Sequence, residues 1–386
     1  MAEPFKNLVN QTTIETAARH FARVWPQFDR SRFEALAGAG LEKLELKARV
    51  LHLAAALGQT LPADFAHACD VIEAALAPPV PLEADGEPAE QNAAERASGL
   101  SGIVIWSLGE FVSSRGLDHA PRALACLHAL TQRSTAEFAI RPFLQRDPAA
   151  VFRTLAKWVY DPSAHVRRLV SEGSRPRLPW GLRLQSLVVD PAPTLPLLRV
   201  LQDDPSVYVR RSVANHLNDI AKDHPDLVAS WVREHLVGAG PERVALLRHA
   251  SRTLIKAGHP PTLQAWGVGQ AFRGKATLAL AATKVRIGAT LGLEVNLVST
   301  ASTPQPLVID YAVHHRRANG ERTPKVFKGW KVTLAPGEKR ALAKQHSFRP
   351  VTTRRLYPGQ HQIDLLINGQ TVAKRDFELL SARQKP

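Results

Sequence analysis

One octapeptide motif occurs twice in this chain, and its spacing constrains the fold more than any other feature. Asp161–Arg168 is Asp-Pro-Ser-Ala-His-Val-Arg-Arg, and Asp204–Arg211, 43 residues later, is Asp-Pro-Ser-Val-Tyr-Val-Arg-Arg. Asp147–Pro148 recurs at the same offset as Asp190–Pro191. Because Asp is a good N-cap and Pro suits the first helical position, each Asp-Pro predicts the start of a helix. Two starts per 43 residues predict stacked helix pairs of the HEAT type.

The hydrophobic pattern divides the chain into two parts. Up to about residue 260 apolar residues recur at helical spacing, as in Leu44–Leu57. The Pro-rich and acidic stretch Ala77–Asn92 predicts an exposed loop between helices. Near Gly267 the helical periods stop and short β-rich runs begin. We therefore expect a mostly α protein: a HEAT-like helical-repeat solenoid over residues 1–268, followed by a small all-β immunoglobulin-like sandwich over residues 269–386.

The sandwich is expected from the number and length of the β-rich runs. About seven strands are predicted, over residues 276–287, 291–299, 306–315, 326–334, 339–347, 360–367 and 370–379. Asn368-Gly369 predicts a tight hairpin between the last two strands. Leu356–His361 resembles the corner that precedes the sixth strand of immunoglobulin-like domains, with His in place of Tyr. No Cys…Trp…Cys framework accompanies it, so the resemblance concerns architecture only.

Charge is distributed unevenly along the chain. The formal net charge is +15, made up of −5 over residues 1–130, +7 over 131–270 and +13 over 271–386. This excess of basic residues toward the C-terminus is expected of a phosphate-binding surface. The alternative is a basic surface that is solvated and binds no partner. The Arg316–Arg322 loop carries part of this excess. Arg316 and Arg317 are therefore candidate contacts to the phosphates of a nucleic acid.

Several classes of protein lack their sequence signals here. No run of 18 apolar residues predicts a membrane span, and the N-terminus does not resemble a signal peptide. Cys69 and Cys126 have no CxxC partner and are expected to be reduced core thiols. Neither metal-ligand spacing nor a Walker loop or GxGxxG turn is present, so we expect no metal and no small-molecule cofactor. A cytoplasmic protein fits these observations.

A row of charged residues follows the register of the repeat. Residues four apart on a helix point the same way, and second helices line the concave face of such arrays. The row consists of Arg133 and Glu137, Arg168 and Glu172, Arg211, Asn215 and Asp219, and Arg248 and Arg252. Stacking would place Glu137, Glu172 and Asp219 on adjacent inner helices, with arginines that hold phosphates beside them. A solvated ion pair, or an Arg/Asp ladder that only holds the stack, remains an alternative for each pair.

The segment after Glu172 interrupts the helix within this row. Gly173–Trp180 is Gly-Ser-Arg-Pro-Arg-Leu-Pro-Trp. Functionally, Arg175 and Arg177 would hold a backbone phosphate, and Trp180 would lie against a sugar or a cationic base. The structural alternative is a loop between repeats with a buried Trp anchor.

These segments resemble a known family. The runs Glu137–Phe143, Val166–Trp180 and Val209–Ile220, together with Glu3–Leu8 and Leu44–Lys47, are similar to the HEAT-like-repeat alkylpurine DNA glycosylases of bacteria, specifically the AlkC branch. The resemblance covers about residues 1–265, and its specific part is the Ser-Glu-Gly-Ser-Arg-Pro-Arg-Leu-Pro-Trp block. Some members carry an immunoglobulin-like domain after the repeats. The Trp/Asp arrangement of the AlkD branch is not found here.

The resemblance implies an activity and roles for the row. It implies hydrolysis of the N-glycosidic bond of cationic N3-alkylated bases, such as 3-methyladenine and 3-methylcytosine, in double-stranded DNA. It also implies that Glu137, Glu172 and Asp219 are the active-site carboxylates, that Trp180 is an active-site aromatic, and that the lesion stays near the base stack. Carboxylates suit this chemistry because positive charge grows on the sugar. With no Lys in the row, we expect a monofunctional enzyme, and Schiff-base chemistry by Lys157 or Lys222 is the alternative. We also expect the basic sandwich to hold duplex DNA opposite the repeats and to complete a clamp. The alternative function is a non-catalytic HEAT scaffold that binds nucleic acid; a protein-binding solenoid would have an apolar concave face.

Overall fold

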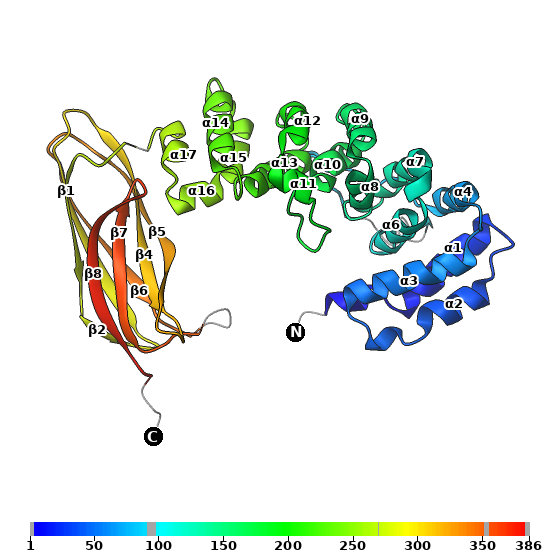
Figure 1. Cartoon of the computed structure of the whole chain (residues 1–386), viewed down its shortest axis with the longest axis horizontal. Coiled ribbons are helices and arrows are strands. Elements are labelled where there is room, and N and C mark those ends of the chain that lie inside the picture. Colours follow the sequence, from blue (N-terminus) through cyan, green and yellow to red (C-terminus); the bar gives the residue numbers. More distant parts are fainter. Residues whose placement is uncertain (1–3, 91–97, 269, 351–354, 383–386) are drawn as a thin grey trace. The chain divides into compact units, whose positions relative to one another are not determined.

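The structure, a computed structural model, describes residues 4–90, 98–268, 270–350 and 355–382. The chain divides into two compact units between Asp223 and His224, and each unit is described by itself. Helices fill the first unit, and the second begins with helices and continues into strands (Figure 1). The predicted order, helices followed by β-strands, is therefore confirmed. The change near Gly267 coincides with the end of the last helix, whereas the division into compact units falls 44 residues earlier, at Asp223.

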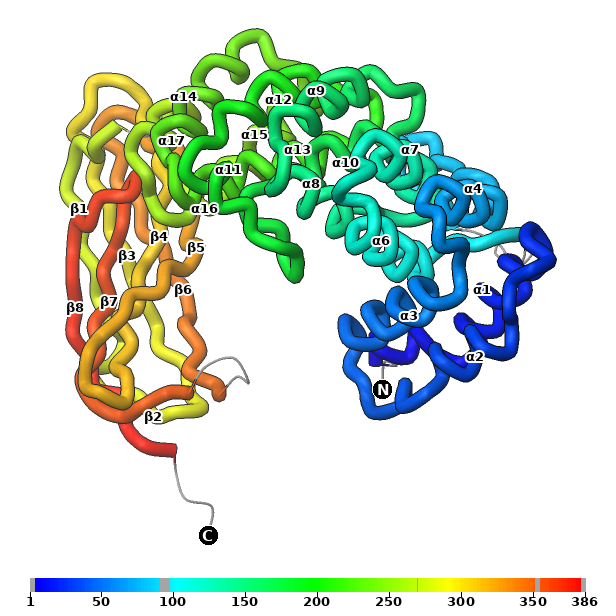
Figure 2. Tube along the Cα trace, turned by 45° about the vertical axis from the view of Figure 1, so that its right-hand side comes forward, coloured from blue at the N-terminus to red at the C-terminus, as the bar shows by residue number. Residues whose placement is uncertain are grey.

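The first unit consists of α-helices joined by short turns and loops. Its α-helices are α1 (Gln11–Val24), α2 (Arg30–Gly38), α3 (Leu46–Thr60), α4 (Phe65–Ala75), α6 (Val104–Arg115), α7 (Ala120–Thr131), α8 (Arg141–Arg146), α9 (Pro148–Trp158), α10 (Ala164–Gly173), α11 (Gln185–Val189), α12 (Leu195–Leu201) and α13 (Val207–Ile220). Short 3₁₀ turns lie at Phe5–Leu8, Leu41–Lys43, Leu117–His119 and Ala192–Thr194. Figures 1 and 2 both place α10 next to α13.

The repeated motif has the same local structure in both copies, but each of its helices begins two residues later than Asp-Pro predicts. Asp147 caps α9 as predicted, since its carboxylate accepts from the Ala150 amide at 3.0 Å. In the octapeptides, however, the N-caps are Ser163 and Ser206, two residues after the Asp. Asp161 instead accepts from the Ser163 amide at 2.8 Å, a local Asx turn that sets the chain's entry into α10. The equivalent bond in the second copy, from Ser206 to Asp204, is 2.9 Å.

Apolar residues in matching positions pack α10 against α13. Val166 and Val170 of α10 are buried, as are Val209 and Val213 of α13, each 43 residues later. The first Arg of the first motif also links the copies: Arg167 donates from Nε to one oxygen of Asp204 at 2.6 Å and from Nη2 to the other at 3.0 Å. This ion pair joins the N-terminal part of α10 to the turn before α13.

The Pro-rich segment after α4 lies across the ends of these helices. Its described residues, 77–90, form no helix and are mostly exposed, as predicted, while Gln91 and Asn92 lie outside the described residues. The Val80 amide donates to the Gln132 carbonyl at 2.8 Å, and Ser206 Oγ donates to the Gly86 carbonyl at 2.7 Å. The predicted loop is therefore held against the ends of α7 and α13.

The second unit contains the helices after Asp223 and two β-sheets. Its helices are α14 (Pro225–Leu236), α15 (Pro241–Ala250), α16 (Arg252–Ala257) and α17 (Pro260–Ala265). The strands are β1 (Gly274–Leu280), β2 (Lys284–Arg286), β3 (Thr290–Ser299), β4 (Gln305–Arg316), β5 (Arg322–Leu334), β6 (Lys339–Ser347), β7 (Gly359–Ile367) and β8 (Gln370–Leu380). Over the described residues the sheets have the orders β1-β3-β6 and β2-β8-β7-β4-β5. Apolar side chains from both sheets share one core, which includes Leu293, Val313 and Phe377.

The prediction of a single strand over residues 276–287 is wrong. This segment forms two strands, because the chain leaves one sheet after Leu280 and joins the other at Lys284, where β2 pairs in parallel with β8. The Asn368-Gly369 hairpin is confirmed: both residues have positive φ, 50° and 79°, as a type I′ turn requires. His361 is buried at the predicted corner, and its Nε2 accepts from the Arg316 amide at 3.3 Å.

Two observations concern the predictions that the chain has no membrane span and that its cysteines are reduced. Along the described parts of the chain, no helix combines the length and apolar character needed to cross a membrane. Cys69 and Cys126 are both free and fully buried, which confirms the prediction of reduced core thiols.

Candidate active site

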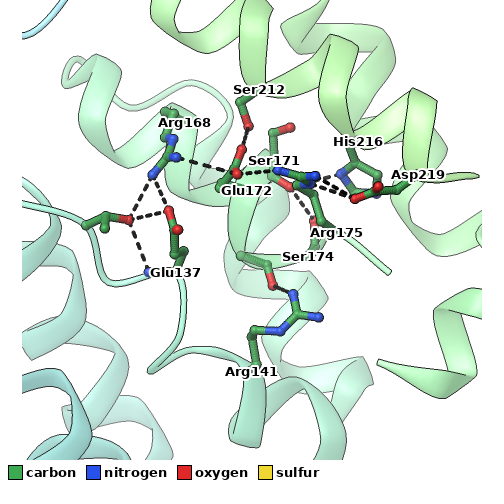
Figure 3. Close-up of polar contacts among 12 residues, drawn as sticks. Glu137, Arg141, Arg168, Ser171, Glu172, Ser174, Arg175, Ser212, His216 and Asp219 are labelled. Atoms are coloured by element: carbon green, nitrogen blue, oxygen red, sulfur yellow. Dashed lines mark hydrogen bonds and ion pairs between the residues drawn. The ribbon is translucent and has the colours of Figure 1, made fainter. Parts of the chain in front are cut away.

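Three buried carboxylates lie in one connected polar network in the first unit (Figure 3). Glu172 lies on α10 and Asp219 on α13, as the register of the motif predicts. Glu137 lies in the turn before α8 and not on a helix, so that part of the prediction is wrong. Arg168 and Arg175 connect the three acids (Figure 3). The structure thus brings together all three carboxylates that the sequence singled out.

Glu172 is the centre of the network. Its Oε1 accepts from Arg175 Nη1 at 2.5 Å and lies 3.5 Å from Arg168 Nη2, while its Oε2 accepts from Ser212 Oγ at 2.6 Å. Burial opposes ionisation of this carboxyl group, but the two guanidinium groups and the Ser212 hydroxyl outweigh burial and lower its pKa below the ordinary value. Glu172 is therefore an anion at neutral pH.

Asp219 is held by two cations. Arg175 donates to its Oδ2 from Nε at 2.8 Å, with Nη2 2.7 Å away, and Lys222 Nζ donates to its Oδ1 at 2.8 Å. The Asp219 side chain is 3% exposed, whereas that of Lys222 is 45% exposed. Asp219 therefore connects the buried network to the surface through Lys222.

Glu137 closes the other end of the row. Its Oε2 accepts from Thr135 Oγ1 at 2.6 Å and from Arg168 Nη1. Arg168 also donates to Thr135 Oγ1 at 2.8 Å, and its guanidinium carbon lies 5.1 Å from the centre of the Tyr208 ring. Burial would lower the pKa of Arg168, but Tyr208, Glu137 and Glu172 raise it above the ordinary value. The arginine is thus fixed as a cation between two acids.

Arg168 and Arg175 were predicted to contact phosphates, but in this structure their guanidinium groups contact carboxylates and are largely buried. Their side chains are 16% and 9% exposed. The sequence predicted phosphate contacts for both. For Arg168 this was because an Arg four residues from an acid has the same pattern whether it is solvated or buried, and for Arg175 because it lies in the Arg-Pro-Arg segment that interrupts the helix. The tertiary packing of α10 against α13 decides the difference.

The segment between α10 and α11, residues 174–184, is here called the Trp180 loop. It projects from the helices just before α11 in both views (Figures 1 and 2). Trp180 is 71% exposed, so the alternative of a buried anchor is wrong. Its φ of 62° is in the left-handed region, which is unusual for a bulky residue and marks a locally strained turn. The structure places this indole in solvent at the tip of the loop, and no described contact joins it to the carboxylates.

Two further predicted DNA contacts of the first unit have acidic partners of their own. Arg177 in the Trp180 loop donates to both oxygens of Asp223, each at 2.6 Å. Arg211, the second Arg of the second motif, is exposed and pairs with Glu87 from the segment after α4. Asn215 is half-buried on α13, one turn before Asp219.

The arginines predicted to continue the row lie in the second unit. Arg248 is on α15, with its guanidinium 4.7 Å from the Trp266 ring, and Arg252 begins α16 and donates to the His249 carbonyl at 2.7 Å. The two are on different helices because α15 ends at Ala250. The expectation that they continue one helical row is therefore wrong.

Arg316 and Arg317 lie at one end of the β-sheets. Arg316 ends β4, and Arg317 begins the loop to β5. Both line a cavity of about 590 Å³ together with Arg355, Asn319 and Tyr357. The cavity is therefore lined by cationic and hydrogen-bonding groups, of the kind that bind phosphate oxygens.

Sequence reasoning missed several residues of the network: Thr135, Arg141, Tyr208, Ser212 and His216. A signal for three of them exists in the differences between the two copies. Ser212, Tyr208 and His216 stand where the first copy has Leu169, His165 and Gly173. His216 is fully buried, and burial together with the Arg175 charge lowers its pKa to about 3, so its ring is neutral.

Among the described residues, no group of three His, Cys, Asp or Glu side chains is arranged to hold a metal ion. The chemistry available here is that of paired carboxylates and guanidinium groups. Buried carboxylates held by guanidinium groups can stabilise positive charge on a bound molecule and orient a water molecule.

Comparison with known proteins extends over nearly the whole chain. A family model described as "Uncharacterised protein YhaZ, C-terminal Ig-like domain" matches residues 275–381. The "Uncharacterized protein YhaZ" of Bacillus subtilis (strain 168) is 34% identical over 376 residues, which is 97% of this chain and 99% of its own. Pseudomonas fluorescens alkylpurine DNA glycosylase AlkC, bound to DNA containing an abasic site analog, matches with a TM-score of 0.81 and 34% identity, over 98% of this chain and 100% of that chain. The chain therefore belongs to the AlkC family of alkylpurine DNA glycosylases and carries the C-terminal Ig-like domain of YhaZ.

Proposed function

We propose that this protein is a DNA glycosylase that hydrolyses the N-glycosidic bond of cationic N3-alkylated bases, 3-methyladenine and 3-methylcytosine, in double-stranded DNA. The observation that carries the proposal is the network in which Arg168 and Arg175 hold Glu137, Glu172 and Asp219 together. The 34% identity to AlkC of Pseudomonas fluorescens, whose structure contains DNA with an abasic site analog, supports the choice of substrate.

The chemistry follows from the charge of the substrate. An N3-alkylated base is already cationic, so it departs without a strong general acid. The transition state then carries growing positive charge on the deoxyribose, as in glycoside hydrolysis. Carboxylates held as anions in a buried site stabilise that charge without reorganising, and one of them can orient the attacking water. In this proposal Arg168 and Arg175 keep Glu172 ionised and hold all three acids in place.

In this proposal the more exposed arginine side chains contact the DNA backbone. We assign phosphate binding to Arg177, Arg211 and the Arg316–Arg317 pair, and contact with the lesion to Trp180. Phosphates would compete with Asp223 and Glu87 for Arg177 and Arg211, since charge-assisted contacts of this kind are exchangeable at a surface. Helices up to residue 268 would form a HEAT-like array, and the Ig-like domain would complete a clamp on DNA.

The proposed enzyme is monofunctional and needs no cofactor. Lys222 contacts one of the acids, but its Nζ donates to Asp219 Oδ1 at 2.8 Å, so this amine is engaged in an ion pair and is not free to form a Schiff base. Borohydride should accordingly trap no covalent complex with abasic DNA. The proposed setting is a monomer on the nucleoid in the bacterial cytoplasm.

The decisive experiment identifies the bases released from methylated duplex DNA by chromatography. Wild-type protein should release 3-methyladenine and 3-methylcytosine, and Asp219→Asn should release neither while still binding the DNA. Salt-sensitive DNA binding without release of any alkylated base would favour a non-catalytic scaffold instead. Release at the wild-type rate by Asp219→Asn would contradict the role given to this carboxylate.

A further inference from the structure

Arg141 is a fully buried arginine that forms no ion pair among the described residues. It is the first residue of α8 and is 0% exposed. Its Nε donates to the Leu182 carbonyl at 2.5 Å and its Nη1 to the Gly173 carbonyl at 2.8 Å, while its Nη2 is buried with no hydrogen-bond partner. Burying a charged group costs free energy that an ion pair usually offsets, and Arg141 has hydrogen bonds to carbonyl groups instead. The positions of these two carbonyl groups indicate what the arginine does.

The two carbonyl groups stand at opposite ends of the Trp180 loop. Gly173 is the last residue of α10, and Leu182 lies three residues before α11. A single guanidinium group therefore ties the point where the chain leaves α10 to the point where it returns (Figure 3 shows Arg141 below the end of α10). Gly173 suits this position because a Cβ there would lie 2.5 Å from a methyl group of Ile140, the residue before Arg141.

The tethered loop carries the groups that the site uses. Arg175, two residues after Gly173, donates to both Glu172 and Asp219. Trp180 stands at the tip in a left-handed conformation. Few bonds hold the loop from within: the Gly181 amide donates to Leu178 at 3.2 Å and the Leu184 amide to Pro176 at 3.2 Å. Arg175, Arg177 and the Ser174 hydroxyl, which donates to the Val170 carbonyl at 2.6 Å, also hold the loop to the rest of the unit. The Arg141 fork is the link that joins the two ends of the loop to each other.

Electrostatics support a link to the site. Burial, and then the positive charge of Arg175, lower the pKa of Arg141 to about 10, while Glu137, Asp219 and Glu172 oppose that shift. Arg141 is therefore close enough to interact with all three acids, yet its donors go to carbonyl groups. Only a planar fork can supply two donors in fixed directions to two carbonyls, so Lys cannot replace it.

We propose that Arg141 is a positioning residue of the site: by bonding Gly173 and Leu182 at once, it fixes the Trp180 loop so that Arg175 stays between Glu172 and Asp219 and Trp180 is presented to the substrate. The part of this proposal that concerns substrate rests on the proposed glycosylase function. The part that concerns the loop does not, and it is measured separately.

Hydrogen exchange by NMR or mass spectrometry tests the loop directly. In the wild-type protein the Gly181 and Leu184 amides should be protected, although they lie in a projecting loop. Arg141→Lys, which keeps the charge and loses the fork, should speed their exchange at least tenfold and leave Val170 in α10 unchanged. The control is Arg49→Lys, because Arg49 is 3% exposed and likewise bonds carbonyls, Leu44 at 2.9 Å and Val9 at 2.8 Å, away from the acids.

Kinetics separate positioning from stability. Single-turnover base release at saturating protein should fall at least tenfold in Arg141→Lys, whereas Arg49→Lys should lose thermal stability without losing rate. The proposal is overturned if Arg141→Lys leaves loop exchange and rate unchanged, or if the wild-type loop amides exchange without protection. If Arg141→Lys does not fold, the wild-type exchange measurement decides the matter. Absence of base release by the wild-type protein would reject the glycosylase function, and loop exchange would still test the tether.

Discussion

Replacing Glu172 by Gln removes one negative charge from the centre of the network and almost nothing else. The side chain is 7% exposed and has the two arginines on Oε1 and the Ser212 hydroxyl on Oε2. In Glu172→Gln the amide oxygen can remain with the arginines, and the amide nitrogen can donate to Ser212, whose hydroxyl can rotate to accept. The shape and the hydrogen bonds are therefore preserved, and the effect measures the charge.

The structure sets the expected magnitudes. A carboxylate placed against developing positive charge is worth about 2–4 kcal/mol, so base release should slow by roughly 10²–10³. The stability cost should be smaller than the ~3–5 kcal/mol lost when a buried ion pair loses one partner. Arg168 keeps Glu137 and Arg175 keeps Asp219, so neither cation is left unpaired. We expect a loss of about 1–3 kcal/mol in the free energy of unfolding.

The assay compares this variant with Asp204→Asn. Asp204 is also buried, also pairs with an arginine of α10, and also links the two copies of the motif, but it does not touch the acids. Single-turnover release of 3-methyladenine and urea unfolding are measured for both variants. Asp204→Asn should lose at least as much stability as Glu172→Gln and retain the wild-type rate when folded.

Two results would refute this reasoning. Release by Glu172→Gln within threefold of the wild-type rate would show that the charge does not act on the transition state. A parallel loss of rate and stability in Asp204→Asn would show that catalysis follows the integrity of the stack and not the carboxylates.

Three further predictions concern other parts of the chain. The pKa of His216 falls to about 3 in the folded protein, so between pH 6.5 and about 3 the unfolded state binds one proton more than the folded state. The free energy of unfolding should therefore decrease by about 1.4 kcal/mol for each unit by which the pH is lowered within that window. In His216→Gln, urea unfolding should show a free energy that depends less steeply on pH. Trp180→Gly should be more stable than Trp180→Ala by about 1 kcal/mol, because φ is 62°, and both should slow base release; full activity of either would contradict the role of the indole. Replacing Arg316 and Arg317 by Gln should reduce the slope of log binding constant against log salt concentration by about 0.9 for each lost phosphate contact, and an unchanged slope would exclude them from the interface.

Much of the architecture could be predicted from the sequence because it is local. The 43-residue repeat and the helical spacing of apolar residues indicate paired helices, and the β-rich runs with Asn368-Gly369 indicate the sheets and one hairpin. The register of the motif also identified Glu172 and Asp219, since residues four apart on a helix share a face whatever surrounds them. Where such reasoning crossed a helix boundary it failed: Glu137 lies in a turn, and Arg248 and Arg252 lie on two helices.

Only the tertiary structure decided the partners of the charged groups. Arg168 bonds Glu137 in the turn before α8, and Arg175 bonds Asp219 on α13, at separations of 31 and 44 residues, and no spacing rule predicts such contacts. The sequence of the Arg-Pro-Arg-Leu-Pro-Trp segment determined that the helix must stop after Glu172, because two prolines cannot continue it. That the segment is fastened by Arg141, and that Trp180 points into solvent, depends on which backbone carbonyls packing brings within reach of a buried guanidinium group.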